Sequence, residues 1–418
     1  MRVIVVVLAV LAALCPEPAR ACGGCFATSP VGQPTPVTAH RMAFLVSPSG
    51  STLWDQITYS GRPEDFVWVL PTAPGARVEL ADEGFFGALV ATTQITMRGP
   101  IPPGPCPDPC GPGLQCGASA AATRAGDPTV GDVRVEYEGV VGPYETATVA
   151  STDPGALLRW LEDRGYAVDA SILPTLSHYV GLGMSFAALR LRPDAGIQRM
   201  QPVRVTVPGL STLLPLRMVA AGIQDHVALE LFVFAEGRME AASFANAEVD
   251  REAIAYDWAS QRFDYDERFL DALYSSPDGT SWVTEFAALA DDRLGSFEAT
   301  DPATGATQSA AEDWAVVTAA LRRPYLTRLR TDLGVAELDR DLDLRAAPGG
   351  DLPAFFQVTR ELNRVEPVCA RTCASGDGTG PGTTALRGSR CSAGWRGRPG
   401  LTFVVLGAAL AALAWRRR

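Results

Sequence analysis

The chain contains no lysine, so all 36 of its basic positions are arginines. Schiff-base catalysis, pyridoxal-phosphate attachment and the P-loop each need a lysine amine, and these classes of chemistry are therefore excluded. Histidine is also scarce, because only His40, His178 and His226 occur. No H-E-x-x-H, no G-x-S-x-G and no other paired histidine ligands are present. These absences remove most common ways of building a poised base or nucleophile, and they favour a protein that is not an enzyme.

The formal net charge is −11, and the two ends of the chain mask a larger acidic excess. The first 21 residues contribute +1, and the residues from Cys391 onward contribute +5. Without these ends the remaining chain carries −17, a charge that repels phosphate backbones. Nucleic acid is therefore not an expected partner. The hydrophobic fraction of 47% and the charged fraction of 20% are typical of a folded globular protein.

The N-terminus has the three parts of a secretory signal peptide. Met1-Arg2 forms the charged region, residues 3–14 form the apolar run, and Ala19-Arg20-Ala21 forms the cleavage site. This pattern predicts a signal peptide over residues 1–21 and a mature chain that begins at Cys22. A lipoprotein, acylated at Cys22, is the alternative, although Arg20 fits a lipobox poorly.

The C-terminus predicts a membrane anchor. Residues 401–415 are apolar or small, and Arg416, Arg417 and Arg418 follow at once. Fifteen residues are fewer than the roughly 20 of a comfortable span, but the arginines predict a cytoplasmic end and an exported body. Together, Cys391, this helix and the arginine cluster resemble the myxobacterial sorting signal MYXO-CTERM, with a plain tail anchor as the alternative. The resemblance implies that residues 391–418 are removed near the cysteine and that the protein is passed to the cell surface, lipid-attached.

Between the two ends we expect one exported body, residues 22–373, with a possible sub-boundary near residue 250. Residues 374–390 are rich in Gly, Ser and Thr and predict a flexible stalk. Residues 99–117 are too rich in proline for a helix or a central strand, so they predict a loop that carries three cysteines.

The patterns within the body predict an α+β fold with an antiparallel sheet core, flanking helices and a more helical C-terminal part. Short alternating or apolar runs predict strands at 41–47, 52–59, 66–70, 133–137, 186–192, 203–207, 214–219 and 227–234. A helix is expected from Pro154, capped by Thr152 or Asp153 and ended by Gly165, and another near 173–180. From Ala253 the pattern predicts helices, one with Trp282, Phe286 and Leu289 at helical spacing, and one after a capping box at Ser309–Glu312.

The cysteines of the body predict disulfides, because exported cysteines generally pair. The candidates are Cys22, Cys25, Cys106, Cys110, Cys116, Cys369 and Cys373, and their odd number leaves one free or modified. Cys22-Gly-Gly-Cys25 also has the spacing of a redox motif, but it opens the mature chain instead of capping a helix. A zinc site built from the three cysteines of the 99–117 loop is a weaker alternative, since no histidine lies nearby.

Carboxylates are the remaining candidates for a site. Asp339, Asp341 and Asp343 match the first ligands of a calcium loop, yet Leu344 and Gly350 stand where a glycine and a glutamate are needed. Another calcium site at an acidic loop such as 264–267 stays open, as does a triad seeded by Asp225-His226. Asp377 to Gly380 superficially matches an aspartic-protease loop but lies in the expected stalk. We expect no catalytic residue, no metal and no cofactor.

Several segments, in order, resemble the secreted bacterial domain-of-unknown-function family 2330. They are Ala21-Cys22-Gly23-Gly24-Cys25-Phe26, Tyr59-x-Gly61, Asp65 to Pro71, Tyr179 to Pro193, Gln201-Pro202, Leu214 to Met218 and Thr327-Arg328-Leu329-Arg330, and they span most of residues 21–335. The resemblance implies export and a common fold, and it assigns no activity or site residue.

These observations predict an exported, C-terminally anchored cell-envelope protein that serves binding or structure. The expected location is the cell surface or outer membrane, with an inner-membrane anchor facing the periplasm as the alternative. The expected partners are the membrane, through the helix or a lipid, and an envelope protein or polysaccharide. A surface hydrolase that uses carboxylates or an unrecognised Ser/His pair is the rival function.

Overall fold

The computed structural model describes residues 25–27, 37–59, 66–101, 138–163, 170–191, 201–223, 226–277, 279–301 and 304–364. The strands are β1 (Cys25–Ala27), β2 (Val37–Leu45), β3 (Gly50–Tyr59), β4 (Phe66–Thr72), β5 (Arg77–Leu80), β6 (Thr96–Arg98), β7 (Glu138–Val141), β8 (Tyr144–Ala150), β9 (Ser185–Leu191), β10 (Val203–Pro208), β11 (Leu213–Leu214), β12 (His226–Ala235), β13 (Met239–Ala241), β14 (Asn246–Glu248), β15 (Ala255–Asp257), β16 (Arg262–Phe263), β17 (Trp282–Leu289), β18 (Glu298–Thr300), β19 (Thr307–Ser309), β20 (Tyr325–Gly334), β21 (Leu342–Ala346), β22 (Phe355–Gln357) and β23 (Arg360–Leu362). The α-helices are α2 (Glu83–Thr93), α3 (Pro154–Asp163), α4 (Leu173–Gly181), α5 (Tyr265–Leu273) and α6 (Ala311–Ala320), and the 3-10 turns are η2 (Ala170–Ile172), η3 (Leu216–Gly222), η4 (Asp292–Ser296) and η5 (Val335–Asp339).

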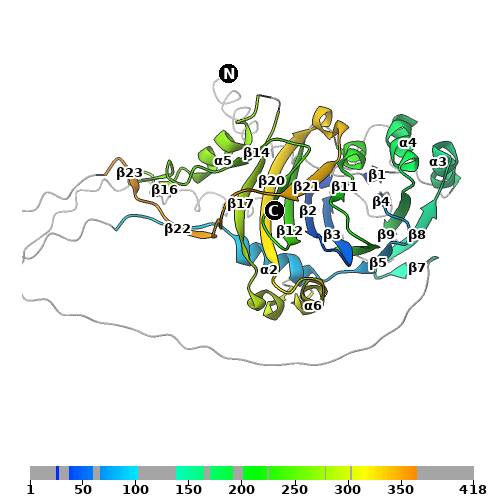
Figure 1. Cartoon of the computed structure of the whole chain (residues 1–418), viewed down its shortest axis with the longest axis horizontal. Helices are drawn as coiled ribbons and strands as arrows, with labels where there is room; N and C mark the ends of the chain where they lie inside the picture. Colours follow the sequence, from blue (N-terminus) through cyan, green and yellow to red (C-terminus); the bar gives the residue numbers. More distant parts are fainter. Residues whose placement is uncertain are drawn as a thin grey trace, which may run out of the picture. The chain divides into compact units, whose positions relative to one another are not determined.

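An eight-stranded sheet forms the centre of the described body, with the order β14-β17-β20-β12-β2-β3-β10-β5 (Figure 1). Most neighbours are antiparallel, but β12 runs parallel to β2, and β14 runs parallel to β17. Residues at the end of β12, from Leu231 to Ala235, are buried on both faces of the sheet. This explains the long apolar run there, because a strand covered on both sides needs no polar face.

A second sheet of five strands, β1-β4-β9-β8-β7, packs against one face of the first. The core between them joins Met42, Phe44 and Ile57 of the large sheet to Trp68 and Leu189 of the small one. Side chains alternate between the two faces of a strand, so the residues of β2 and β3 that point into this core are every second one. The face-to-face packing therefore makes the two sheets a sandwich.

Helices cover the two outer faces of this sandwich (Figure 1). On the large sheet, Phe85 of α2 and Trp314 of α6 pack against Trp54 and Phe234. On the small sheet, Leu161 of α3 and Leu176, Tyr179 of α4 pack with Phe186, Ala188 and other apolar residues. The described body thus has four layers, helix, sheet, sheet and helix, and helices cover part of the outer face of each sheet.

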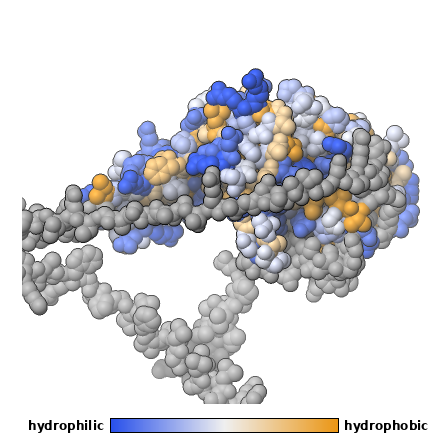
Figure 2. Space-filling model, turned by 90° about the horizontal axis from the view of Figure 1, so that it is seen from below, coloured by the Kyte–Doolittle hydropathy of each residue, from blue (hydrophilic) through white to orange (hydrophobic). Residues whose placement is uncertain are grey.

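A smaller cluster lies beside the edge strand β14 and its neighbour β17, where Leu273 of α5 packs with Ile254 and Val358. On the face seen in Figure 2, the hydrophobic side chains of the described residues lie in small separate groups between hydrophilic ones. Scattered exposed apolar residues of this kind are normal for a protein surface. Among the described residues, none of the helices is both long and apolar enough to cross a membrane.

The structure is mostly sheet with some helices, so the coarse α+β prediction holds. The strands expected at 41–47, 52–59, 66–70, 186–192, 203–207 and 227–234 are present, as are the helices at 154 and 173. Asp153 caps α3, since its carboxylate accepts a hydrogen bond of 2.9 Å from the N–H of Gly155. β4, however, belongs to the small sheet and not to the sheet of β2 and β3. Residues 133–137, expected as a strand, lie outside the described residues.

The prediction of a more helical C-terminal part is wrong. Trp282–Leu289 is the strand β17, although its large apolar residues stand at helical spacing. A β-bulge between Thr284 and Phe286 shifts the pairing with β20 by one residue, which breaks the period-two pattern. Residues 255–257 also form a strand, β15, while α5 and α6 are helical as expected.

Two shorter predictions need correction. The segment 214–219 was expected as a strand, but only Leu213–Leu214 pairs, and η3 follows because Pro215 interrupts the ladder. Helix α6 begins after Ala310, and its cap has no side-chain hydrogen bond. Ser309 accepts from the N–H of Ala311, and Glu312 pairs with Arg204 instead of closing a capping box.

Candidate functional site

A polar cleft lies at the edge of the large sheet where β12 and β17 begin and β20 ends. We call it the Phe244 cleft, and its lining residues are Ala242, Ser243, Phe244, Ala245, Ser276, Thr280, Glu337 and Arg340. The first four form the connection between β13 and β14, and the others come from loops and from η5. The cleft has a volume of about 270 Å³, which is room for a ligand of the size of a sugar or an amino acid.

Glu337 is the acidic group of the Phe244 cleft. Its carboxylate accepts hydrogen bonds from the N–H and the hydroxyl of Thr280, at 2.7 and 2.6 Å, and from the N–H of Gly334 at 2.9 Å. Burial alone would raise the pKa of Glu337, but these hydrogen bonds, together with the nearby His226, hold it below its usual value. The carboxylate is therefore ionised at neutral pH.

Arg340 is the basic group of the cleft. Its guanidinium lies 5.4 Å from the centre of the Phe244 ring, and its Nε–H donates to Asp339 at 3.0 Å. The Phe244 ring in turn meets Trp282 edge to face at 6.3 Å. The Arg340 side chain is 50% exposed, so stacking on Phe244 orients it while leaving it accessible to a ligand. A positive and a negative group, two serines and a threonine thus line a cleft that carries no net charge.

Asp341, which follows the cleft residue Arg340 in the chain, connects three parts of the body. Its carboxylate accepts hydrogen bonds from the hydroxyl of Tyr179 at 2.5 Å and from the N–H of Arg217 at 3.0 Å, and it lies 3.3 Å from His178 Nε2. Burial, and then the hydrogen bond to Asp341, raise the pKa of Tyr179, so this hydroxyl remains a donor. Asp341 therefore ties α4 and η3 to the loop after η5.

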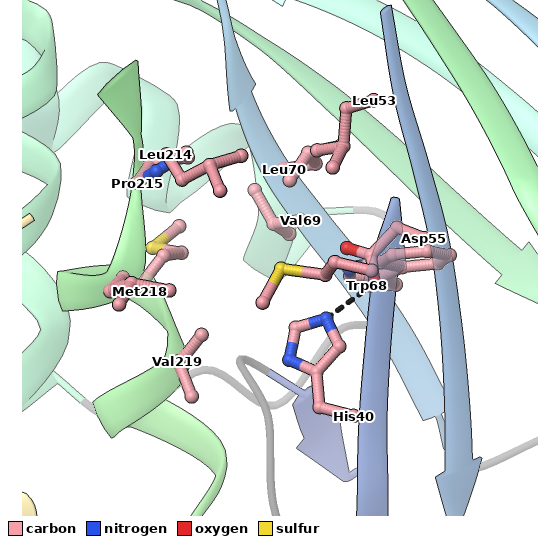
Figure 3. A pocket seen from close by; sticks show the side chains of 12 residues that line it. His40, Leu53, Asp55, Trp68, Val69, Leu70, Leu214, Pro215, Met218 and Val219 are labelled. Atoms are coloured by element: carbon pink, nitrogen blue, oxygen red, sulfur yellow. Dashed lines mark hydrogen bonds and ion pairs between the residues drawn. The ribbon is translucent and has the colours of Figure 1, made fainter. Parts of the chain in front are cut away.

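A second site lies in the core between the two sheets. His40 of β2 and Asp55 of β3 point to the same face, and the imidazole Nε2–H donates to the Asp55 carboxylate (Figure 3). The two residues are 5% and 1% exposed. Nδ1 of His40 has no hydrogen-bond partner in the described structure. Figure 3 shows this nitrogen pointing away from Asp55, toward the side of η3 that carries Met218 and Val219.

The cavity beside His40 is small and apolar. Its volume is about 20 Å³, which is room for about one water molecule. His40, Met42, Trp68, Met218 and Val219 line it, together with Leu53, Asp55, Val69, Leu70, Leu214, Pro215 and Leu216. No hydroxyl or thiol stands among these described lining residues.

Two further charged clusters stabilise the fold. Arg204 donates to Asp313 at 2.6 Å and to Glu312 at 3.1 Å, and Trp54 Nε1–H donates to Asp313 at 2.7 Å. On β20, Arg328 lies 2.6 Å from Glu230 and 3.7 Å from the bulge residue Glu285. Both clusters lie on the face of the large sheet that α2 and α6 partly cover.

The Thr327-Arg328-Leu329-Arg330 segment forms a ladder of ion pairs across this face. Arg328 donates to Glu230 at 2.6 Å, and Arg330 donates to Glu285 at 3.1 Å. Leu329, between the two arginines, points into the opposite core. This alternation explains why a strand that crosses the middle of the protein contains two arginines.

The acidic triplet expected from the sequence does not gather into one site. Asp341 bonds Tyr179, while Asp343 accepts from the hydroxyl of Thr212 and Asp339 pairs with Arg340. Asp264 pairs with Arg268 of the same helix. Among the described residues, no group of three or more His, Cys, Asp or Glu side chains is placed to hold a metal ion.

Other predicted residues lie outside the described part of the chain. These are Cys22, Cys106, Cys110, Cys116, Cys369, Cys373, Cys391, Arg416, Arg417 and Arg418, and with them Asp225 and the 377–380 segment. Cys25 lies in β1, opposite Trp68, but its side chain is not described. The disulfides, the zinc alternative and the sorting tail therefore stay predictions.

No sequence motif marks the Phe244 cleft or pairs His40 with Asp55. The cleft is assembled from loops more than 90 residues apart in the chain, and nothing in a linear motif joins them. For the pair a signal existed, because His40 and Asp55 each share a strand face with apolar residues, Met42 and Leu53. Polar residues at core positions on neighbouring strands are candidates for a mutual hydrogen bond.

Comparison with known protein families matches residues 18–330 to a model described as "Uncharacterized protein conserved in bacteria (DUF2330)". The matched range contains the Arg328–Arg330 ladder and the His40–Asp55 pair, and it ends before Glu337 and Arg340 of the Phe244 cleft. Neither the curated proteins nor the solved structures that were compared contain a match to the chain.

Proposed function

Since this chain belongs to the DUF2330 family of uncharacterized proteins conserved in bacteria, we propose that it is an exported, C-terminally anchored envelope protein whose body binds a saccharide in the Phe244 cleft. The observation that carries the binding part is the lining of this cleft. The half-exposed guanidinium of Arg340 offers donors, and the Glu337 carboxylate keeps a lone-pair position beyond the three hydrogen bonds that it accepts from Thr280 and Gly334. Ser243, Ser276 and Thr280 add hydroxyl groups to the lining. A neutral ligand rich in hydroxyl groups matches such a mixed lining.

The export and anchoring part rests on the two ends of the sequence. Residues 1–21 have the pattern of a signal peptide, and residues 401–418 have that of an apolar helix with a terminal arginine cluster. The tail from Cys391 also resembles the MYXO-CTERM sorting signal. A body held at the cell surface meets envelope polysaccharide, which makes a saccharide the ligand class that location and lining share.

The binding proposal is tested with the full chain, purified in a detergent that has no sugar headgroup. Saturation-transfer difference NMR with glucose, galactose and oligomers of N-acetylglucosamine should show transfer to at least one sugar. Arg340→Leu should abolish this transfer, because it removes the accessible donor of the cleft.

Arg293→Leu is the matched control. Arg293 is an exposed arginine that pairs with a near neighbour, Asp291, just as Arg340 pairs with Asp339, and it does not line the cleft. It should leave saccharide binding unchanged. Equal transfer in wild type and Arg340→Leu, or no transfer to any of the sugars, would contradict the proposal.

A further inference from the structure

Arg340, the accessible donor of the Phe244 cleft, is held by weak contacts of its own side chain. Its guanidinium donates to Asp339, whose side chain is 66% exposed, and lies over the Phe244 ring. An ion pair between two exposed side chains fixes a geometry only weakly. The direction of the Arg340 side chain therefore depends on where the backbone that follows η5 is held.

The next residue, Asp341, fixes this backbone through its carboxylate. Oδ1 of Asp341 accepts the hydrogen bond from the Tyr179 hydroxyl, at 2.5 Å, and also the one from the Arg217 N–H, at 3.0 Å. The carboxylate is 8% exposed, and Tyr179 is fully buried in the cluster that joins α4 to the small sheet. Breaking these bonds would leave buried polar groups without these partners, which is costly. Asp341 is therefore attached to a rigid part of the body.

The backbone around Asp341 is also attached to the opposite wall of the cleft. The Ser243 hydroxyl donates to the carbonyl of Asp341 at 2.8 Å and accepts from the N–H of Asp343 at 3.1 Å. Ser243 lines the cleft and precedes Phe244 in the connection between β13 and β14. Asp341 thus connects the segment that carries Arg340 with the segment that carries Phe244.

Asp341 and Tyr179 are not among the described residues that line the cleft, so they act on a ligand through Arg340. Hydrogen bonds weaken steeply when donor and acceptor are misaligned, so a displaced guanidinium binds a ligand less well. We propose that Asp341, held by the Tyr179 hydroxyl, is the positioning residue that keeps the Arg340 guanidinium over Phe244 for saccharide binding. This inference rests on the proposed function of the cleft.

The test uses the full chain, in a detergent without a sugar headgroup, with its arginines labelled with nitrogen-15 at Nε. The chain has 36 arginines, and Arg340→Leu identifies the Arg340 signal by its loss. Tyr179→Phe removes the hydroxyl that holds Asp341 and keeps the buried ring. Without any sugar, this variant should shift the Arg340 signal, because the guanidinium leaves its place over the Phe244 ring. It should also weaken binding of the sugar that binds wild type at least fivefold.

Tyr144→Phe is the matched control. Tyr144, on β8 of the small sheet, is likewise fully buried, and its hydroxyl donates to the carbonyl of Gln201 at 2.6 Å. This variant should lower the stability without changing the Arg340 signal or the affinity. Asp341→Ala should reproduce the effects of Tyr179→Phe. Asp341→Asn, which keeps an oxygen at the place of Oδ1, should restore both readouts.

Two results separate this inference from the function on which it rests. If either readout keeps its wild-type value in Tyr179→Phe and Asp341→Ala, or if Tyr144→Phe changes both readouts equally, Asp341 only stabilises the fold. The inference is then wrong, while saccharide binding stands. If wild type binds none of the sugars, the proposed function is wrong, and with it the role of Asp341 in binding. The Arg340 signal in the absence of sugar then decides whether Asp341 positions the guanidinium.

Discussion

At the residue scale, the buried arginines and the carboxylates beside them form ion pairs. Arg204, Arg238, Glu285 and Asp313 are all buried, and each has an oppositely charged partner among the described residues. Burial alone would lower the pKa of Arg204, but Asp313 and its acidic neighbours raise it above the usual value. Such pairs specify one arrangement of the core, because either partner alone is strongly unfavourable there.

Removing one partner of the Arg204–Asp313 pair should therefore be severe. We expect Asp313→Ala to lower the free energy of unfolding by about 3–5 kcal/mol, since it leaves a buried guanidinium and the Trp54 N–H without their partner. Asp291→Ala removes the partner of Arg293, whose side chain is 88% exposed, and should change the stability far less, because a solvent-exposed ion pair contributes little. Urea unfolding of both variants measures the difference, and similar losses would show that Asp313 is not a stabilising partner.

Glu337 predicts a pH dependence with a definite sign. Its pKa is lower in the folded protein than the ordinary value, so its contribution to stability is complete above the unfolded pKa of about 4.3. That contribution is lost as the pH falls through the folded pKa. Wild type should consequently lose more stability between pH 5 and pH 3 than Glu337→Gln, whose side chain does not titrate. Parallel urea curves across this range test it, and equal slopes for the two proteins would refute the assignment.

At the element scale, the sequence predicts most strands and fails where geometry is not periodic. Alternation identifies β2, β3, β9, β10 and β12, because each has one face in a core. In β17 the bulge at Glu285 shifts the pairing register by one residue. The side chains after the bulge therefore change faces, and the large apolar residues of this strand stand at helical spacing. In η3, Pro215 and packing against the small sheet override an apolar run that otherwise favours a strand.

The approach of α2 to β19 gives a prediction about two helical glycines. A Cβ on Gly84 would lie 2.5 Å from the backbone nitrogen of Ser309, whereas nothing lies within 4 Å of one on Gly181. Gly84→Ala should destabilise by about 1–3 kcal/mol through overpacking. Gly181→Ala, at an exposed position in α4, should stabilise by about 0.4–1 kcal/mol. Thermal melting of both variants checks the opposite signs, and a shift of the same sign would contradict the packing argument.

At the scale of the whole molecule, the Phe244 cleft and the His40–Asp55 pair differ in how much of each can be predicted from the sequence. His40 and Asp55 can be recognised in the sequence as polar residues inside apolar strands. The register that brings them together places Met42, two residues after His40, opposite Asp55, and this register is known only from the folded sheet. The Phe244 cleft depends on three separate segments, 242–245, 276–280 and 337–340, and loop positions do not follow from periodicity. The chain ends are the reverse case, since their patterns are clear in sequence and lie outside the described residues.

The proposed anchoring is tested by deletion of residues 401–418. The truncated chain should appear in the medium or the periplasm, because the deleted residues are the predicted membrane anchor and the predicted stalk, residues 374–390, is not apolar. Cell fractionation measures this, and a truncated chain that still sediments with membranes would favour acylation at Cys22.

Cys391→Ser separates the sorting signal from a plain anchor. It should block surface display and leave the apolar helix attached, which mass spectrometry of the membrane fraction detects. An unchanged mass and location would reject the resemblance to the MYXO-CTERM signal while leaving a simple tail anchor possible.

The order of strands in the large sheet sets the time at which the protein folds during synthesis. β20, residues 325–334, lies between β12 and β17, so it joins two parts of the sheet that were made earlier. Until these residues leave the ribosome, β12 and β17 each have an unpaired edge, and the apolar ends of both strands lack a neighbour. Because long-range pairing of this kind is slow, most of the chain is complete before its central sheet closes. The central sheet of this topology is therefore completed only when the late strand β20 inserts between the two earlier strands β12 and β17.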